Sequence, residues 1–162
     1  MSAVEVLAGV DIVALRLSEE GALQVLLLRR QREPYAGQWA LPGALVNGRC
    51  ADTSLDAAAA RALVDKARLQ PQYLEQVATV GNGVRDPRGW SLSTCYLALL
   101  GPDVEPQDEN LRFAELSGVI AGAQALPFDH AQLVRLAAER LRGKSVYSSL
   151  PLYLLASRFT VT

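Results

Sequence analysis

The chain has 162 residues and a mass of 17.5 kDa, and 50% of its residues are hydrophobic and 20% charged, the size and balance of one soluble globular domain. Its formal net charge is -1, so the basic excess of a nucleic-acid-binding chain is missing and we expect no direct nucleic-acid binding by this chain. No apolar run reaches the roughly 18 residues of a membrane span, and the N-terminal residues lack the pattern of a signal peptide, so we expect a cytoplasmic protein without membrane contact.

Strands are predicted in the first part of the chain, where β-branched and aliphatic residues are bounded by turn residues; the predicted strands cover 4–17, as one long or two short strands, 23–28, 39–41 and 45–46. The turn at 18–21 makes a hairpin of the first pair. The polar loop 29–36 carries arginines that either face a ligand or lie in a solvated loop.

A helix is predicted from about Ser54 to Ala67, because leucines and alanines recur there on one face and would pack on a sheet. Thr53 with Asp56 three residues on resembles a capping box. Asp52 and Asp56 lie near the positive end of this helix, where acidic residues stabilise it. A strand, a glycine loop at Pro42–Gly43 and a helix in this order suit phosphate binding by backbone N–H groups.

The second part of the chain predicts more strands and a closing helix. Apolar patterns predict strands at 72–80, 91–100 and 113–121, and a helix from about His130 to Arg142 with Asp129 as its N-cap. The segment 101–110 is acidic and contains two prolines, so we expect an exposed loop. Together these elements predict a mixed sheet between helices, an α+β or α/β sandwich.

The stretch 37–69 resembles the Nudix box, whose pattern is G, five residues, E, seven residues, then REUxEExGU with U aliphatic. Arg61 matches the box arginine, Leu63 and Leu69 match aliphatic positions, and Asp65 falls on the first glutamate of the EE pair. The resemblance implies a Nudix-like α/β/α sandwich with the box helix at about 54–67. It also implies magnesium or manganese held by helix glutamates, and hydrolysis of a nucleoside diphosphate linked to another group.

The chain departs from the box at its acidic positions, because three of the four box glutamates are replaced by non-acidic residues. Ala62 and Lys66 stand at two of them, and the upstream glutamate falls on Thr53. Positions 62, 65 and 66 have the spacing i, i+3 and i+4, so we expect their side chains to converge on one patch. An alanine, an aspartate and a lysine do not make the oxygen ligand set that magnesium requires. We therefore expect metal binding and hydrolysis to be weak or lost, with Asp65 as the remaining metal and catalytic candidate.

Further segments are similar to Nudix-related regulators of NAD metabolism and to bacterial ADP-ribose pyrophosphatases; these segments are 35–43, 73–76, 85–89, 128–130 and 147–148. In such regulators a degenerate Nudix domain senses ADP-ribose or a related nucleotide, a winged-helix domain that binds DNA follows it, and the domains usually pair as homodimers. The resemblance implies that residues 1–162 are a single Nudix-like domain without a winged-helix domain, and that a homodimer forms. The sequence is compatible both with a naturally short protein and with a piece of a longer one.

The candidate ligand-binding residues are mainly cationic or lie in the glycine loop; they are Arg61, Lys66, Arg85, Arg88, Gly43 and Trp39. Lysine pairs with phosphate as a point charge. The turn with Arg85 and Arg88 borders the nucleotide by resemblance, although turn arginines are also commonly solvent-exposed. Trp39 is a candidate to stack on a purine or to join the core. We expect a structural role for His130, the only histidine.

Three hypotheses follow from these residues. In the first, the domain is a sensor that binds a nucleoside diphosphate-linked ligand such as ADP-ribose, needs no metal for binding and turns the ligand over weakly or not at all. In the second, it is an active Nudix pyrophosphohydrolase with a non-standard metal site that includes Asp65. In the third, it is a dimerisation domain with an empty site.

Overall fold

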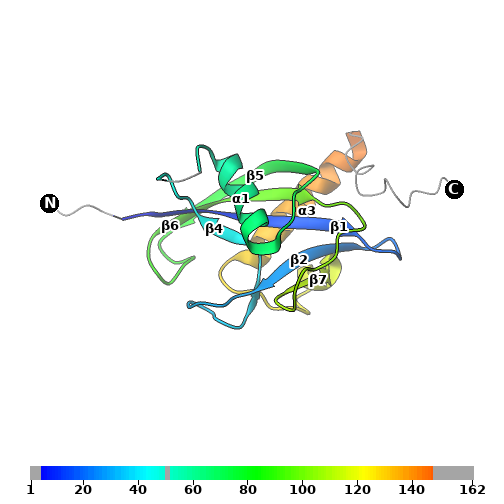
Figure 1. The fold of residues 1–162 in the computed structure, drawn as a ribbon, viewed down its shortest axis with the longest axis horizontal. Coiled ribbons are helices and arrows are strands. Elements are labelled where there is room, and N and C mark those ends of the chain that lie inside the picture. The colour runs from blue at the N-terminus through cyan, green and yellow to red at the C-terminus, as the bar shows by residue number, and fades with distance from the viewer. Residues whose placement is uncertain (1–4, 50–51, 148–162) are drawn as a thin grey trace.

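The computed structural model describes residues 5–49 and 52–147. These residues form a seven-stranded mixed sheet with helices on both faces (Figure 1). The strands are β1 (Leu7–Leu17), β2 (Leu23–Arg29), β3 (Trp39–Ala40), β4 (Gly43–Leu45), β5 (Tyr73–Asn82), β6 (Ser91–Leu99) and β7 (Leu111–Glu115), and the helices are α1 (Leu55–Ala67), α2 (Leu116–Ile120) and α3 (His130–Tyr147). Residue 148, the second residue of the family-like segment 147–148, lies outside the described residues.

The long strand β1 organises the sheet. It runs parallel to β6, with Leu7 opposite Ser91 and Leu15 opposite Leu99, and β6 pairs antiparallel with β5. On its other side β1 pairs with β2 only from Leu15 to Leu17. Beyond that point β4 lies beside β1 and β3 lies beside β2. The sheet therefore forks between β1 and β2.

Side chains alternate along β1 and β6 and so build two cores. Ile12 and Ala14 face α1, and Val13 and Leu15 face α2 and α3. Figure 1 shows α1 on one side of the sheet and α3 on the other. Leu63 on α1 is fully buried in the first core. The predicted mixed sheet between helices, an α/β/α sandwich, is confirmed.

The prediction of a strand over 113–121 is wrong in its second half. The strand β7 ends at Glu115, and the chain turns into the short helix α2. Leu116, Val119 and Ile120 have helical spacing and pack in the same core as α3. Val119 and Ile120 are β-branched, which favours strand locally, but packing against α3 decides the structure.

The start of α1 also differs from the predicted cap. Ser54, not Thr53, is the N-cap residue, and its Oγ accepts a hydrogen bond from the Ala57 backbone N–H at 3.0 Å. This bond satisfies one backbone donor that the first helical turn leaves unpaired. Asp56 is engaged elsewhere, because its carboxylate accepts a hydrogen bond from the Tyr96 hydroxyl at 2.6 Å.

We expect Ser54→Ala to lower the free energy of unfolding by about 1 kcal/mol, because it removes this cap. Thr53→Ala is the matched control one residue away, and its effect should stay within about 0.5 kcal/mol. Urea unfolding measures both variants. A larger loss for Thr53→Ala than for Ser54→Ala would contradict the cap assignment.

The strand β5 forms one edge of the sheet. Its pairing with β6 shifts register between Gln76 and Ala78, so Val77 forms a bulge. The Val77 carbonyl accepts a hydrogen bond at 3.1 Å from Arg140, which projects from α3. In the part of the chain that the structure describes, no helix has the length and apolar character to cross a membrane.

Candidate functional site: a cationic cleft at the fork of the sheet

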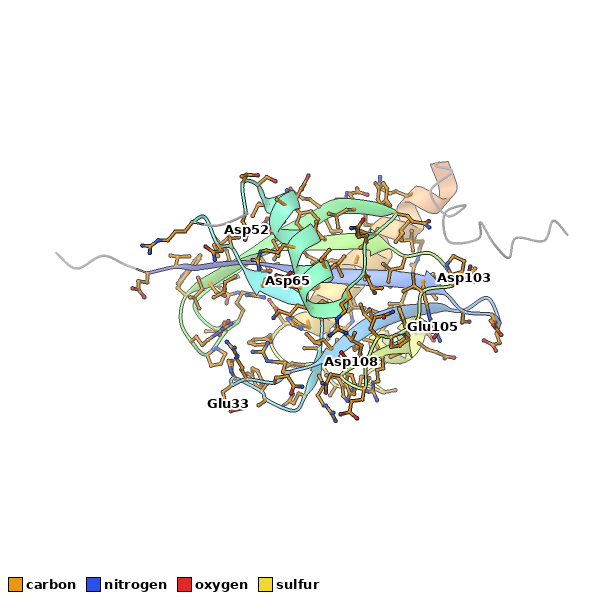
Figure 2. The ribbon with its side chains drawn as sticks, in the orientation of Figure 1. Glu33, Asp52, Asp65, Asp103, Glu105 and Asp108 are labelled. Atoms are coloured by element: carbon orange, nitrogen blue, oxygen red, sulfur yellow. The ribbon has the colours of Figure 1, made fainter. Side chains whose placement is uncertain are left out.

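A cleft of about 680 Å³ opens where β1 and β2 separate. Its volume lies within the range of small-molecule sites. The strands β1, β2 and β4, the second half of α1 and the loop 85–88 contribute lining residues. Figure 2 shows three acidic lining residues, Asp65 on α1, Glu33 in the loop after β2 and Asp108 in the loop before β7.

Cationic side chains outnumber acidic ones in this cleft, although the whole chain has a net charge of -1. The cationic lining residues are Arg29, Arg30, Arg32, Arg61, Lys66, Arg85 and Arg88, and the acidic ones are Asp11, Glu33, Asp65, Asp86 and Asp108. The cleft therefore concentrates positive charge in a molecule that has no overall excess, which favours an anionic ligand.

The cations crowd one another. Partial burial, together with the guanidinium groups of Arg30 and Arg32, lowers the pKa of Lys66 below its ordinary value. Burial and the charge of Arg88 likewise lower the pKa of Arg30. Lys66 and Arg32 are exposed residues, so a ligand in the cleft can reach them. An anion bound among these groups would relieve their mutual repulsion.

Arg61, a predicted ligand residue, lies at the cleft but is held by the protein. Its Nε and Nη2 donate to the Asp52 carboxylate at 2.7 and 2.8 Å, and Nη2 also donates to the Leu45 carbonyl at 3.0 Å. Asp52 is buried and accepts a further bond from the Asn47 backbone N–H. The hydrogen bond from Arg61 is the largest of the contacts that lower the pKa of Asp52. Asp52 thus connects Arg61 of α1 to the backbone at Asn47, beyond the helix-end role that the sequence suggested.

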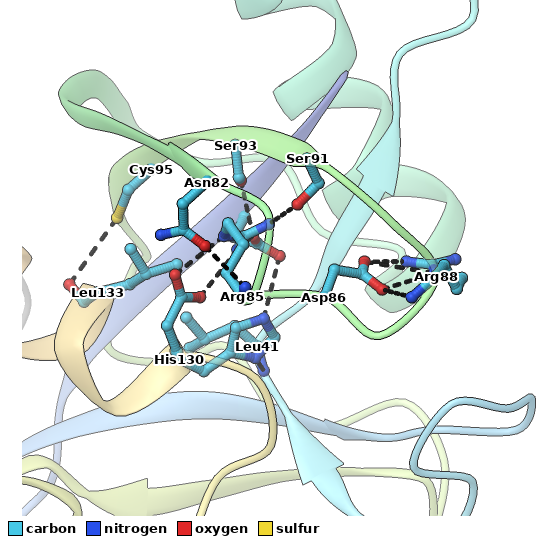
Figure 3. A network of polar contacts seen from close by, with 12 residues as sticks. Leu41, Asn82, Arg85, Asp86, Arg88, Ser91, Ser93, Cys95, His130 and Leu133 are labelled. Carbon is cyan, nitrogen blue, oxygen red and sulfur yellow. Dashed lines mark hydrogen bonds and ion pairs between the residues drawn. The ribbon is translucent and has the colours of Figure 1, made fainter. Parts of the chain in front are cut away.

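Arg85 is almost fully buried at the base of the cleft, with a side chain only 6% exposed (Figure 3). Its Nε and Nη2 donate to the Asp129 carboxylate at 2.9 and 2.8 Å, and Nη1 donates to Ser91 Oγ at 2.9 Å. Nη2 also lies 3.4 Å from the Asp11 carboxylate. Asp129 directly precedes α3, and its backbone carbonyl accepts the Leu133 N–H at 3.2 Å, but its carboxylate accepts hydrogen bonds from Arg85.

His130 joins the same network from the first turn of α3. Its Nδ1 accepts a hydrogen bond from the Leu41 backbone N–H at 3.1 Å, and its Nε2 lies 3.3 Å from the Asp11 carboxylate. Asp11 also accepts a bond from Ser93 Oγ at 2.6 Å. The network connects β1, β6, α3 and the residue after β3. The structural role of His130 is to link α3 to Leu41 and to Asp11 of β1.

Of the remaining predicted residues, Arg88 and Gly43 line the cleft and Trp39 does not belong to its lining. Arg88 donates to the buried Asp86 carboxylate at 2.8 Å while its side chain is 43% exposed. A Cβ on Gly43 would lie 2.7 Å from the Val10 carbonyl oxygen, so glycine is needed where β4 meets β1. The Trp39 ring packs against the core shared with α3, beneath the guanidinium of Arg112 at 4.3 Å.

The residues at the box positions do not fit a divalent metal ion. Ala62 is fully buried in the core, so the expectation of one shared patch for positions 62, 65 and 66 is wrong. Asp65 is 55% exposed and pairs with Arg61 at 3.5 Å, and Lys66 supplies an ammonium. Across residues 5–49 and 52–147, no three His, Cys, Asp or Glu side chains are grouped to hold a metal ion. One carboxylate beside an ammonium is a poor ligand set for a hard cation.

The helix N-terminus is not where the cleft lies. Within the described part of the chain, α1 contributes Arg61 from its middle and Asp65 and Lys66 from its last turn to the lining. Arg30 and Arg32 were predicted only as part of a loop that either faces a ligand or is solvated, and no role was predicted for Asp11. The sequence does contain one indication of the cationic cleft, because arginines stand at alternate positions in the polar loop 29–36, directly after a strand.

Acidification should destabilise the domain, because four carboxyl groups have a pKa below their ordinary value; they are Asp11, Asp52, Glu75 and Asp86. For Asp11, burial alone would raise the pKa, but the contacts with His130, Ser93 and Arg85 together outweigh burial and leave the pKa below its ordinary value. A lowered pKa in the folded state contributes stability above the unfolded pKa, about 4, and this contribution is lost as pH falls through the folded pKa. We expect Tm to change little between about pH 7 and 5 and to fall steeply below about 4. Thermal unfolding across this range tests it, and an unchanged Tm at about pH 3 would contradict it.

This forked sheet with a cationic cleft beside α1 is the structure of a Nudix domain, and the chain belongs to the Nudix family. It is similar to the Nudix domain of Shewanella oneidensis NrtR, solved in complex with ADP ribose, with 36% identity and a TM-score of 0.75, covering 86% of this chain and 90% of that one. It is also 39% identical over 148 residues to the ADPR responsive transcriptional repressor NtrR of Acinetobacter baylyi, covering 89% of this chain and 58% of the repressor.

A third relative, an ADP-ribose pyrophosphatase of Methanocaldococcus jannaschii, is 27% identical over 115 residues, covering 69% of this chain and 64% of that protein. The chain thus spans about three fifths of the length of the curated relatives it matches. No family model matches the chain.

Proposed function

We propose that this Nudix domain binds a nucleoside diphosphate linked to another group, with ADP-ribose as the first candidate, and acts as a sensor without efficient hydrolysis. The observation that carries the proposal is the gathering of Lys66, Arg30, Arg32 and Arg88 in the lining of one cleft. Burial, together with the neighbouring guanidinium groups, lowers the pKa of Lys66 and of Arg30 there. The negative charge of a diphosphate would compensate the excess of cationic side chains in the cleft lining.

The names of two relatives support the choice of ligand. One relative was solved with ADP ribose bound, and another is an ADPR responsive repressor. The box positions support binding over turnover, because they offer one carboxylate and one ammonium where a metal would need several oxygen ligands. Lys66, Arg32 and Arg88 would compensate the phosphates directly, so binding needs no metal.

Calorimetry with ADP-ribose tests this proposal. We expect binding to persist with unchanged affinity in EDTA, since the cations that hold the ligand belong to the protein. At a ligand concentration of about 100 times Kd, the free energy of unfolding should rise by about 2.7 kcal/mol, because only the folded domain binds. Loss of binding in EDTA would count against the proposal.

The second candidate is an active pyrophosphohydrolase, favoured by one observation: Asp65 lies exposed on the cleft wall. It predicts manganese-dependent release of AMP from ADP-ribose, lost in Asp65→Asn. Thermal unfolding of the domain with a panel of nucleotides, measured with and without manganese, separates both candidates from a domain with an empty site, which no nucleotide would stabilise.

A further inference from the structure

A buried acidic residue, Asp86, lies in the lining of the cationic cleft. It is 4% exposed and stands between Arg85 and Arg88 in the sequence. Burial alone would raise the pKa of Asp86, but the hydrogen bonds from Arg88 outweigh burial and leave the pKa below its ordinary value. The carboxylate is therefore charged at neutral pH. A fixed negative charge in a cleft for an anion lowers affinity unless it serves another purpose.

The residues from Asp86 to Gly89 form a turn whose sequence explains its shape. The Asp86 backbone carbonyl accepts a hydrogen bond from the Gly89 N–H at 3.2 Å, and the Asp86 carboxylate accepts one from the Arg88 backbone N–H at 2.9 Å. Aspartate, proline and glycine at the first, second and fourth positions are typical of a β-turn, and an aspartate side chain commonly bonds the N–H two residues on. The turn therefore fixes the backbone of Arg88 relative to Asp86.

The same carboxylate also holds the side chain of Arg88 (Figure 3). The Arg88 Nε donates to Oδ1 of Asp86 at 3.1 Å, and Nη2 donates to Oδ2 at 2.8 Å. Such a pair of parallel bonds fixes the orientation of the planar guanidinium as well as its position. Among the residues that the structure describes, no protein group accepts a bond from Nη1 of Arg88. The side chain is 43% exposed and lines the cleft, so Nη1 is left for a ligand.

We propose that Asp86 is a positioning residue for ligand binding: it holds Arg88 so that the free Nη1 receives an anionic group of the ligand. The inference rests on the proposed function. A long side chain that is ordered only when the ligand binds lowers the affinity, because its freedom is lost at that moment. Asp86 orders Arg88 when the protein folds. The gain from this preorganised guanidinium exceeds the loss from one nearby negative charge.

The sign of one affinity change tests the proposal. Asp86→Asn keeps the size of the side chain and removes its charge. We expect ADP-ribose to bind about threefold to tenfold more weakly, measured by calorimetry on the whole chain in EDTA, because Arg88 loses the charged partner that orients it. Charge alone predicts tighter binding, since the variant has one negative charge fewer beside an anionic ligand. Affinity equal to or above that of the wild type would overturn the proposal.

Asp65→Asn is the matched control, because it makes the same substitution at an exposed acidic residue of the same cleft. Asp65 pairs with Arg61, which Asp52 holds independently. We expect ADP-ribose to bind this variant as tightly as the wild type or up to about threefold more tightly. A loss as large as that of Asp86→Asn would show that the effect is common to the acids of the cleft, and the positioning role would be wrong.

A double-variant cycle separates the positioning of Arg88 from simple support of the loop. Arg88→Met removes the guanidinium and keeps much of the side-chain length. In this background Asp86→Asn should weaken ADP-ribose binding no further, because no guanidinium is left to orient. An equal loss in both backgrounds would show that Asp86 supports the loop without acting through Arg88, which overturns the proposal.

One measurement on the wild type remains decisive even if Asp86→Asn disturbs the loop. In nitrogen-15 NMR without ligand, we expect the Nε–H of Arg88 to exchange with water at least about tenfold more slowly than that of the exposed Arg32, because it is bonded to a buried carboxylate. Equal exchange rates would overturn the proposal. If the wild type binds neither ADP-ribose nor inorganic pyrophosphate, the proposed function is wrong and the positioning role falls with it. If the wild type binds and Asp86→Asn binds equally well, only the positioning role is wrong.

Discussion

Lys66→Glu should weaken ADP-ribose binding by about 100-fold or more, which corresponds to about 2.7 kcal/mol. The substitution removes the ammonium of Lys66, which lines the cleft near Arg30, Arg32 and Arg61. A hydrogen bond between charged groups contributes about 1.5–3 kcal/mol. The new carboxylate would also stand beside Asp65 and repel the phosphates. Calorimetry at fixed ionic strength measures the loss, since salt screens such interactions.

Arg135→Glu is the control for Lys66→Glu, because it makes the same change of net charge on α3, outside the cleft lining. We expect it to leave ADP-ribose affinity within about twofold of the wild type. Lys66→Arg keeps the positive charge and should retain most of the binding. Wild-type affinity in Lys66→Glu would show that the phosphates lie elsewhere.

Arg85→Met should lower the free energy of unfolding by about 3 kcal/mol, because it leaves the partly buried carboxylates of Asp11 and Asp129 without their common partner. For a domain of this size the loss corresponds to a fall in Tm of roughly 6–12 °C. Methionine retains much of the side-chain volume, so the lost charge causes most of the effect. Urea unfolding and thermal unfolding measure it.

Arg135→Met is the matched control for Arg85→Met, since Arg135 is exposed on α3, and its effect should stay within about 0.5 kcal/mol. The double variant Arg85→Met/Asp129→Asn should lose less than the sum of the single variants, because the second change removes one of the stranded charges. Strict additivity would show that Arg85 and Asp129 act independently.

The sequence predicts the fold well where local patterns decide it. The apolar stripe with Leu63 predicts α1, and alternation along 91–100 predicts β6, so the layered sandwich follows. Local patterns mislead at 116–120, where β-branched residues fold into a helix because it packs against α3. They also misplace the cap of α1 by one residue, since Thr53 and Ser54 are both good caps and the loop geometry selects between them.

The site was harder to predict because its contacts join distant parts of the chain. Cationic candidates such as Lys66 and Arg88 do lie together in one cleft. Their partners do not follow from spacing: Arg85 binds Asp129, 44 residues away. The fork between β1 and β2 places the loop after β2 opposite α1, and this register is a property of the whole sheet.

The bulged edge strand β5 bears on how copies of the molecule associate. A new strand added along β5 would need a regular row of backbone acceptors, but Val77 interrupts the row and Arg140 already occupies its carbonyl. The edge strand β5 is therefore a poor template for pairing with a strand of another molecule. Substitution of Arg140 would free the Val77 carbonyl at this edge of the sheet, and the homodimer implied by the family resemblance stays a prediction.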